Sequence, residues 1–159
     1  RPGFVEGVRL LAKYGLHFEF TLAPSHFPNA IKLMEQCPDT AFILDHVGSP
    51  NIAEKAWEPW ASGIKAFADA GPHPCKFSNF CCKADLDRWT VDDLKPYADH
   101  VIDCFGPDRL IWGSDWPHLC RAASYLRWLE AADQLTAHLG EADRRKIFRD
   151  NAVQFYRLA

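Results

Sequence analysis

Apolar residues recur with two different periods in the first part of the chain, and the change of period separates two kinds of element. Over residues 4–14 they recur every three or four positions, which is typical of a helix with one buried face, and Gly15 follows as a C-cap. Over residues 16–22 every second residue is apolar, which predicts a strand. The other face of this strand carries Glu19 and Thr21, which suit either the lumen of a barrel or a solvated sheet edge.

The rest of the chain repeats this pair of elements. Short apolar runs predict three more strands, at residues 41–44, 75–80 and 109–112. Helical periodicity predicts further helices at residues 25–36, 51–68, 91–104, 124–138 and 141–156. Ser25, Asn51 and Thr90 are the expected N-caps of the first three of these helices.

Strands that alternate with helices are typical of a parallel sheet with crossover helices outside it. A small open sheet is one such architecture, but no glycine-rich phosphate loop follows any of the strands. A complete (β/α)8 barrel has eight strands and typically takes about 250 residues. We therefore expect an α/β fold that forms half of such a barrel, as one partial domain over residues 1–159.

The composition is that of an ordinary folded domain, with 159 residues, 48% hydrophobic and 25% charged. The formal net charge is −3 with no basic block, and no apolar run approaches the roughly 20 residues that span a bilayer, so neither nucleic acid nor a membrane is an expected partner. Six cysteines follow no zinc-binding spacing, which predicts reduced thiols in a cytoplasmic protein. The chain opens at Arg1 without a signal-peptide pattern, and we expect it to be a piece of a longer protein.

Titratable residues stand where two of the predicted strands end. Asp115 follows the last strand in the segment Gly113-Ser-Asp-Trp-Pro, and His46 follows the strand at residues 41–44. Barrel enzymes keep their reacting groups at the carboxyl ends of the strands. The carboxylate of Asp115 and the imidazole of His46 are therefore expected to face one cavity, although Asp115 could instead cap the next helix.

The strand at residues 75–80 places Lys76 and Ser78 on one face. A buried lysine is costly unless it meets an anion, so Lys76 is expected either to bind a substrate carboxylate or carbonyl or to form a salt bridge inside the barrel. Trp116 is a candidate wall for a substrate ring, or a packing residue at the barrel mouth.

An ordered series of motifs resembles the amidohydrolase superfamily, and in particular its lactonase branch, which includes sugar lactonases and 2-pyrone-4,6-dicarboxylate lactonase. The motifs are Leu44-Asp-His-Val-Gly48-Ser-Pro50, Lys76-Phe-Ser78, Trp89-Thr90, Phe105-Gly-Pro-Asp-Arg109, Gly113-Ser-Asp-Trp-Pro117 and Asn151-Ala152. The resemblance implies strands five to eight of a (β/α)8 barrel, with residues 4–14 as the fourth helix. The family's first strand, with its His-x-His pair, would lie before Arg1.

The resemblance also implies roles. Asp115 matches the family's general base, and His46 matches the histidine that polarises the substrate carbonyl or, in metal-bearing relatives, binds a divalent ion, zinc foremost. Lys76, Ser78, Trp116 and His118 are the expected substrate contacts. Two departures bear on the substrate, because Asn79 stands where the branch usually has glycine, and His118 stands where a small apolar residue is common.

The expected function is hydrolysis of the lactone ring of a sugar acid or a pyrone dicarboxylate, with a small-molecule lactone or carboxylate as the partner. One alternative within the superfamily is metal-dependent decarboxylation, with His46 and Asp115 as ligands. A second alternative is that the chain alone is an inactive truncated fragment, since half a barrel has two open edges, unless two copies close a barrel as a homodimer.

Overall fold

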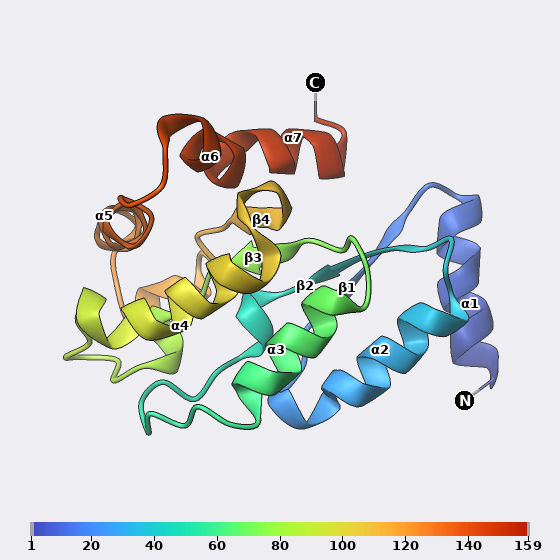
Figure 1. The fold of residues 1–159 in the computed structure, drawn as a ribbon, viewed down its shortest axis with the longest axis horizontal. Coiled ribbons are helices and arrows are strands. Elements are labelled where there is room, and N and C mark those ends of the chain that lie inside the picture. The colour runs from blue at the N-terminus through green and yellow to red at the C-terminus, as the bar shows by residue number, and fades with distance from the viewer. Residues whose placement is uncertain (1, 159) are drawn as a thin grey trace.

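Four parallel strands with helices packed along them make up the computed structural model, which describes residues 2–158 (Figure 1). The strands are β1 (His17–Phe20), β2 (Ala41–Leu44), β3 (Cys75–Phe77) and β4 (Leu110–Trp112), in the same order in the sheet as in the chain. The helices are α1 (Pro2–Lys13), α2 (Phe27–Gln36), α3 (Trp60–Asp69), α4 (Val91–Phe105), α5 (Tyr125–Leu135), α6 (Glu141–Arg145) and α7 (Asn151–Tyr156). This alternation confirms the predicted half of a (β/α)8 barrel.

The core lies between the sheet and the helices α2, α3 and α4, which run side by side in Figure 1. Phe20 of β1 stacks on Phe42 of β2 with 5.2 Å between ring centroids, and Phe67 of α3 meets Phe20 edge-on at 5.8 Å. Full burial of one such side chain contributes about 1.5–3 kcal/mol. The alternating pattern of β1 therefore directs its aromatic residues to the helices and leaves Glu19 and Thr21 for the opposite, luminal face.

The helix predicted from Asn51 begins nine residues later, at Trp60. The Asn51 side chain donates to Glu54, and the backbone pairs with Ala56 in an isolated bridge, so the segment forms an irregular loop. Proline at position 59 suits a helix start because it has no N–H to place. The prediction of one long helix was wrong for residues 51–59. The apolar residues of this segment, among them Trp57, belong to a loop instead.

Two other predicted helix details differ from the structure. The Ser25 hydroxyl caps nothing, because residues 24–26 form a 3-10 turn and α2 starts at Phe27. The predicted last helix is divided by a π-helical turn, Lys146–Asp150, whose extra residue accompanies complete burial of Ile147. The capping role of Thr90 is confirmed, since its hydroxyl accepts from Asp93 N–H and the Asp93 carboxylate accepts in return.

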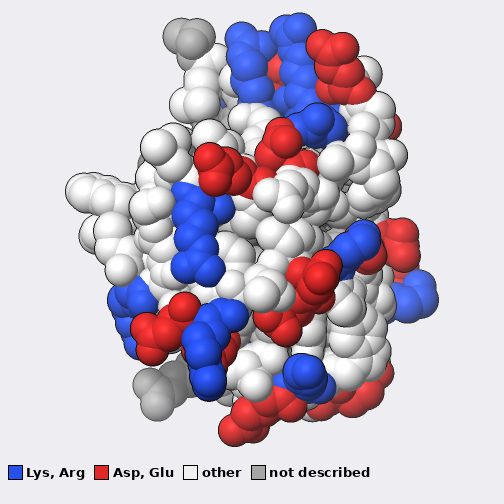
Figure 2. All heavy atoms as spheres, turned by 90° about the vertical axis from the view of Figure 1, so that its left-hand side faces the viewer, with Lys and Arg blue, Asp and Glu red and all other residues white. Residues whose placement is uncertain are grey.

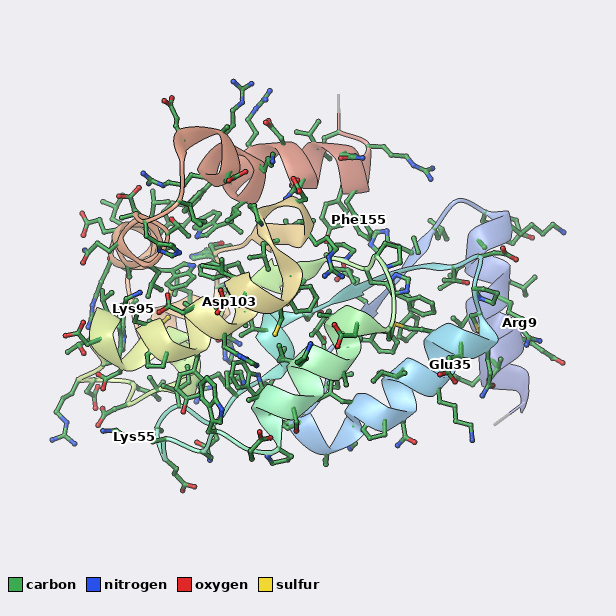
Figure 3. The ribbon with its side chains drawn as sticks, viewed as in Figure 1. Arg9, Glu35, Lys55, Lys95, Asp103 and Phe155 are labelled. Atoms are coloured by element: carbon green, nitrogen blue, oxygen red, sulfur yellow. The ribbon has the colours of Figure 1, made fainter. Side chains whose placement is uncertain are left out.

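The outer surface carries charges of both signs. Figure 2 shows lysine and arginine side chains interspersed with aspartate and glutamate on the face that it presents. In Figure 3, Arg9, Glu35 and Lys95 point away from the body of their helices. Across residues 2–158, none of the helices combines the length and apolarity needed to cross a membrane.

Candidate active site

The carboxyl ends of β2 and β4 bring His46 and Asp115 together. His46 Nε2 and Asp115 Oδ1 lie 3.6 Å apart, and about four-fifths of each side chain is shielded from solvent. Neighbouring parallel strands end at one edge of the sheet, so residues 69 positions apart in the chain meet across β3. The two residues expected to face one cavity therefore do face each other.

Both residues sit on backbone with left-handed conformation. The φ angles of His46, Val47 and Asp115 are 51°, 47° and 57°. Such values are uncommon for residues other than glycine, and a β-branched residue such as Val47 adopts them least readily. Each costs of the order of 1–3 kcal/mol and persists only where the surrounding structure holds it.

The ring of His46 is fixed from its other nitrogen. His46 Nδ1 lies 2.9 Å from Ser78 Oγ, a hydrogen-bonding distance. Burial lowers the pKa of His46, and the nearby charge of Asp115 opposes that shift without cancelling it. The imidazole is therefore neutral at neutral pH.

Ser78 was expected to contact the substrate, but only 1% of this residue is exposed. Its hydroxyl faces His46, and its Cβ lies against Gly113 of the loop after β4. Ser78 is thus placed behind the histidine rather than at an open surface.

Lys76 forms the salt bridges that were the alternative to substrate binding. Its ammonium lies 2.7 Å from Glu19 Oε2 and 2.8 Å from Asp45 Oδ1, and Thr21 Oγ1 donates to the other oxygen of Asp45 at 2.7 Å. Burial by itself lowers the pKa of Lys76, but the hydrogen bonds from its ammonium to Asp45 and Glu19 outweigh burial and raise the pKa well above its ordinary value. Its charge is therefore compensated by two carboxylates, one of them on the residue that precedes His46.

Tyr156 of α7 completes this luminal cluster, and sequence reasoning did not predict its role. Its phenol donates to Glu19 Oε1 at 2.9 Å, across 137 positions of the chain. Burial, followed by the hydrogen bond to Glu19, raises the pKa of Tyr156 to about 12. The neighbouring Phe155 points from α7 toward the strands in Figure 3 and packs on His17. The 3.6-residue period of the last helix does not distinguish an apolar side chain from a half-buried phenol that donates a hydrogen bond.

Trp116 and His118 lie on the loop after β4, beyond Asp115. The Trp116 side chain is 68% exposed, so it is free to contact a ligand at the rim. His118 is exposed too and approaches the Arg121 guanidinium at 3.4 Å.

Asn79, the residue in place of the branch's glycine, is buried, with φ of 64°. Asparagine adopts this left-handed conformation more readily than other residues with a side chain. The departure therefore preserves the backbone course after β3.

His46 and Asp115 fit two positions of a zinc site. Two ligands at about 2.0–2.2 Å from one tetrahedral ion are separated by roughly 3.3–3.6 Å, close to the separation of Nε2 and Oδ1. Within residues 2–158 no cluster of three or more His, Cys, Asp or Glu side chains is arranged to hold an ion. The part of the chain that the structure describes thus offers two ligands here, and further ligands would have to come from elsewhere.

The chain is similar in sequence to curated lactonases and hydrolases. The chain is 31% identical over 170 residues to L-fucono-1,5-lactonase of Burkholderia ambifaria, an alignment that covers 99% of the chain and 55% of the relative. It is 27% identical over 119 residues to a 2-pyrone-4,6-dicarboxylate hydrolase of Comamonas testosteroni, covering 68% of the chain and 37% of the relative.

A crystal structure of an amidohydrolase from Burkholderia multivorans with bound zinc superimposes with a TM-score of 0.92 at 27% identity, covering 98% of this chain and 57% of that one. The chain thus spans about half the length of the curated relatives it matches. The amidohydrolase family profile matches residues 1–158. On the strength of that match, the chain belongs to the amidohydrolase family.

Proposed function

We propose that the protein carrying this chain hydrolyses the lactone ring of a sugar acid or a pyrone dicarboxylate, with Asp115 as general base and His46 as the group that polarises the carbonyl. The observation that supports this most strongly is the approach of His46 Nε2 to within 3.6 Å of Asp115 Oδ1 at the carboxyl ends of the strands. The named activities of the lactonase and hydrolase relatives support the same reaction class. Because the relatives are about twice as long, we propose that activity requires the remaining strands of a barrel.

The Asp115 carboxylate takes a proton from a water molecule, whose oxygen then attacks the lactone carbonyl carbon. The tetrahedral intermediate collapses when the bond from that carbon to the ring oxygen breaks. Asp115 returns its proton to the ring oxygen, which leaves as a hydroxyl group. The products are a carboxylic acid and an alcohol within one opened molecule.

His46 serves the carbonyl oxygen in the same steps. When the Ser78 hydroxyl donates to Nδ1, the proton of the neutral ring is on Nε2. Nε2 is the ring nitrogen nearer to Asp115. That N–H donates to the oxygen as negative charge develops on it. A buried and neutral imidazole is suited to this task because it donates without giving the proton away.

If a divalent metal is bound, we propose that His46 and Asp115 are two of its ligands. In that case the Ser78 hydroxyl accepts from Nδ1–H, which turns the Nε2 lone pair toward the ion. A bound zinc ion would polarise the carbonyl and acidify water.

In this proposal Lys76 stabilises the site through its salt bridges and does not bind the substrate. One of its two salt bridges holds Asp45, the residue that precedes His46, and the other holds Glu19, so its charge is used within the cluster and ring recognition is left to the rim. Trp116 and His118 are the proposed substrate contacts there, since both are exposed beside Asp115.

The test is an assay of the purified protein against a panel of aldonolactones and pyrone dicarboxylates, with and without a chelator. We expect ring opening, followed by titration of the acid released, for at least one member of the panel. A loss of turnover in chelator that zinc restores would support the ligand roles of His46 and Asp115. Absence of ring opening across the panel, together with carbon dioxide release from hydroxybenzoates, would replace the proposal with decarboxylation.

A further inference from the structure

Two buried tryptophans hold the two loops that carry His46 and Asp115. Trp60, the first residue of α3, donates its indole N–H to the carbonyl oxygen of Val47 at 2.7 Å. Trp128, in the first turn of α5, donates in the same way to the carbonyl oxygen of Gly113 at 2.9 Å. The two bonds therefore reach one residue after His46 and two residues before Asp115.

Both indoles are enclosed, so their N–H groups have no solvent to bond instead. Trp60 is 1% exposed and packs against Trp57 and Tyr97, whereas Trp128 is fully buried beside Phe80. A buried carbonyl that loses its donor bears the cost of an unmade hydrogen bond. Each bond is thus more valuable to its loop than an exposed bond of equal length.

The two loops that these indoles bind, after β2 and after β4, contain residues with strained backbone. The left-handed φ angles of His46, Val47 and Asp115 are unfavourable by themselves and need external contacts to persist. The turn after β2 also has its own short bonds, from Gly48 N–H to Asp45 O and from Ser49 N–H to His46 O. The indole of Trp60 binds the next carbonyl, that of Val47, so it is placed to keep this turn from relaxing.

We propose that Trp60 and Trp128 are positioning residues that set the separation of His46 and Asp115 from outside the barrel. Neither indole contacts the reacting atoms. Each fixes one loop to the start of an outer helix, so the two helices determine where the imidazole and the carboxylate meet. This assignment rests on the proposed function for its catalytic consequence, but its structural part does not depend on any activity.

The chain offers a matched control in Trp89. Its indole N–H donates to the carbonyl oxygen of Ala122 at 2.9 Å, and the residue is 4% exposed, so its burial is similar to that of Trp60 and Trp128. The Ala122 oxygen also accepts a longer bond, of 3.4 Å, from the Arg127 guanidinium. Ala122 follows the 3-10 turn His118–Arg121, which contains the proposed rim contact His118 but neither His46 nor Asp115. Removal of this donor should weaken the fold without moving His46 or Asp115.

The experiment replaces each tryptophan with phenylalanine in the complete protein, because phenylalanine keeps an aromatic ring and removes the N–H. In Trp60→Phe and Trp128→Phe we expect kcat to fall about 10- to 100-fold with KM within about threefold of wild type, as misplacement of reacting groups by 1 Å costs. Trp89→Phe should lower the melting temperature by no more than the other two substitutions, because Arg127 remains as a donor to Ala122 O, and should leave kcat within about threefold. Equal kcat values in all three variants would overturn the proposal.

Amide hydrogen exchange gives a second result that needs no substrate. Trp60→Phe should accelerate exchange of Gly48 and Ser49 at least about tenfold and leave Leu119, whose N–H bonds to Asp115 O, unchanged. Trp128→Phe should show the opposite pattern. If the wild-type protein opens no lactone but each variant shows faster exchange only in its own loop, the proposed function fails and the positioning role stands. If both variants change the exchange of Gly48, Ser49 and Leu119 to the same extent, the positioning role is refuted.

Should Trp60→Phe fail to fold, 3-benzothienylalanine at position 60 serves in its place. This residue has the shape of tryptophan with sulfur instead of the N–H. Faster exchange at Gly48 in that protein supports the hydrogen bond itself as the positioning contact, and wild-type exchange contradicts it.

Discussion

At the scale of single residues, the site is built on a charged cluster that the chain satisfies internally. Lys76 joins the carboxylates of Glu19 and Asp45, and Tyr156 donates to Glu19 from the far end of the chain. Burial by itself raises the pKa of Glu19, but the hydrogen bonds from Lys76 and Tyr156 outweigh it and lower the pKa below its ordinary value of 4.5. The folded protein thus favours the ionised form of this carboxyl.

The stability of the fold should therefore depend on the charge of Glu19. Since the folded pKa is lowered, the stabilisation is complete above pH 4.5 and is lost as the pH falls through the folded value. The contribution should be no more than about 1 kcal/mol, because the side chain is 34% exposed and solvent screens the pair. We expect Glu19→Gln to flatten the fall in unfolding free energy between about pH 5 and pH 3, measured by urea denaturation.

The control for this measurement is Glu35→Gln, on the exposed outer face of α2 (Figure 3). It should leave the pH dependence of the wild-type protein intact. If the pH profile of Glu19→Gln coincides with that of Glu35→Gln, the charge of Glu19 does not contribute to the stability of the fold.

The sequence predicts His46 and Asp115 better than it predicts their surroundings. Both residues stand directly after apolar runs, and the end of a parallel strand is a place that local patterning reveals. Tyr156 could not be found in this way, because its contact with Glu19 depends on how the last helix returns to the first strand. The pairing of Ser78 with His46 was missed for the same reason, as it joins two strand ends rather than two neighbours in sequence.

At the scale of elements, α2 and α3 pack closely because α3 has a glycine at the contact. A Cβ atom at Gly63 would overlap the ring of Phe27, which is 1% exposed and has no room to move aside. The loop after His46 meets the same ring, since a Cβ at Gly48 would also collide with it. Phe27 therefore links the packing of two helices to the turn that carries the histidine.

We expect Gly63→Ala to lower the unfolding free energy by about 1–3 kcal/mol, as overpacking of a filled core does. The matched control is Gly7→Ala, in an exposed stretch of α1 where a Cβ meets nothing within 4 Å. That change should stabilise the protein by about 0.5–1 kcal/mol, the helix preference of alanine over glycine. Chemical denaturation of the two variants decides the matter, and a stabilising Gly63→Ala would contradict the close packing.

The sequence predicts the end of a helix correctly where a side chain there makes the capping hydrogen bond. The hydroxyl of Thr90 begins α4 with a hydrogen bond that its own residue type makes available. The N-cap position of α3 is Pro59, which has no side-chain acceptor, and the carboxylate of the preceding Glu58 accepts from Ser62 N–H instead. Asn51 has the right chemistry for a cap but uses it on Glu54 within the loop.

At the scale of the whole molecule, the sheet has two outer strands, and they differ. Along β1 runs a hollow of about 590 Å³ between α1 and α2, whose apolar lining includes Phe4 and Phe18. At β4, the carbonyl oxygen of Leu110 accepts from the Asn151 side chain, which covers part of that edge. Two outer strands of this kind suit a half barrel that the remaining strands complete. Sequence periodicity predicted the half barrel because it reveals the number of strands and their alternation with helices.

The carboxylate that meets His46 is the central group of the proposed mechanism, and replacement of Asp115 by asparagine tests its role most directly. Asparagine preserves the shape of the side chain and tolerates the left-handed backbone, so the melting temperature should change little. We expect Asp115→Asn to lower kcat for lactone ring opening about 10²- to 10⁴-fold, the range for loss of a general base. Asp103→Asn, on the outer face of α4 (Figure 3), should keep wild-type turnover. Substantial turnover by Asp115→Asn would contradict the assignment of the base and, with it, the proposed mechanism.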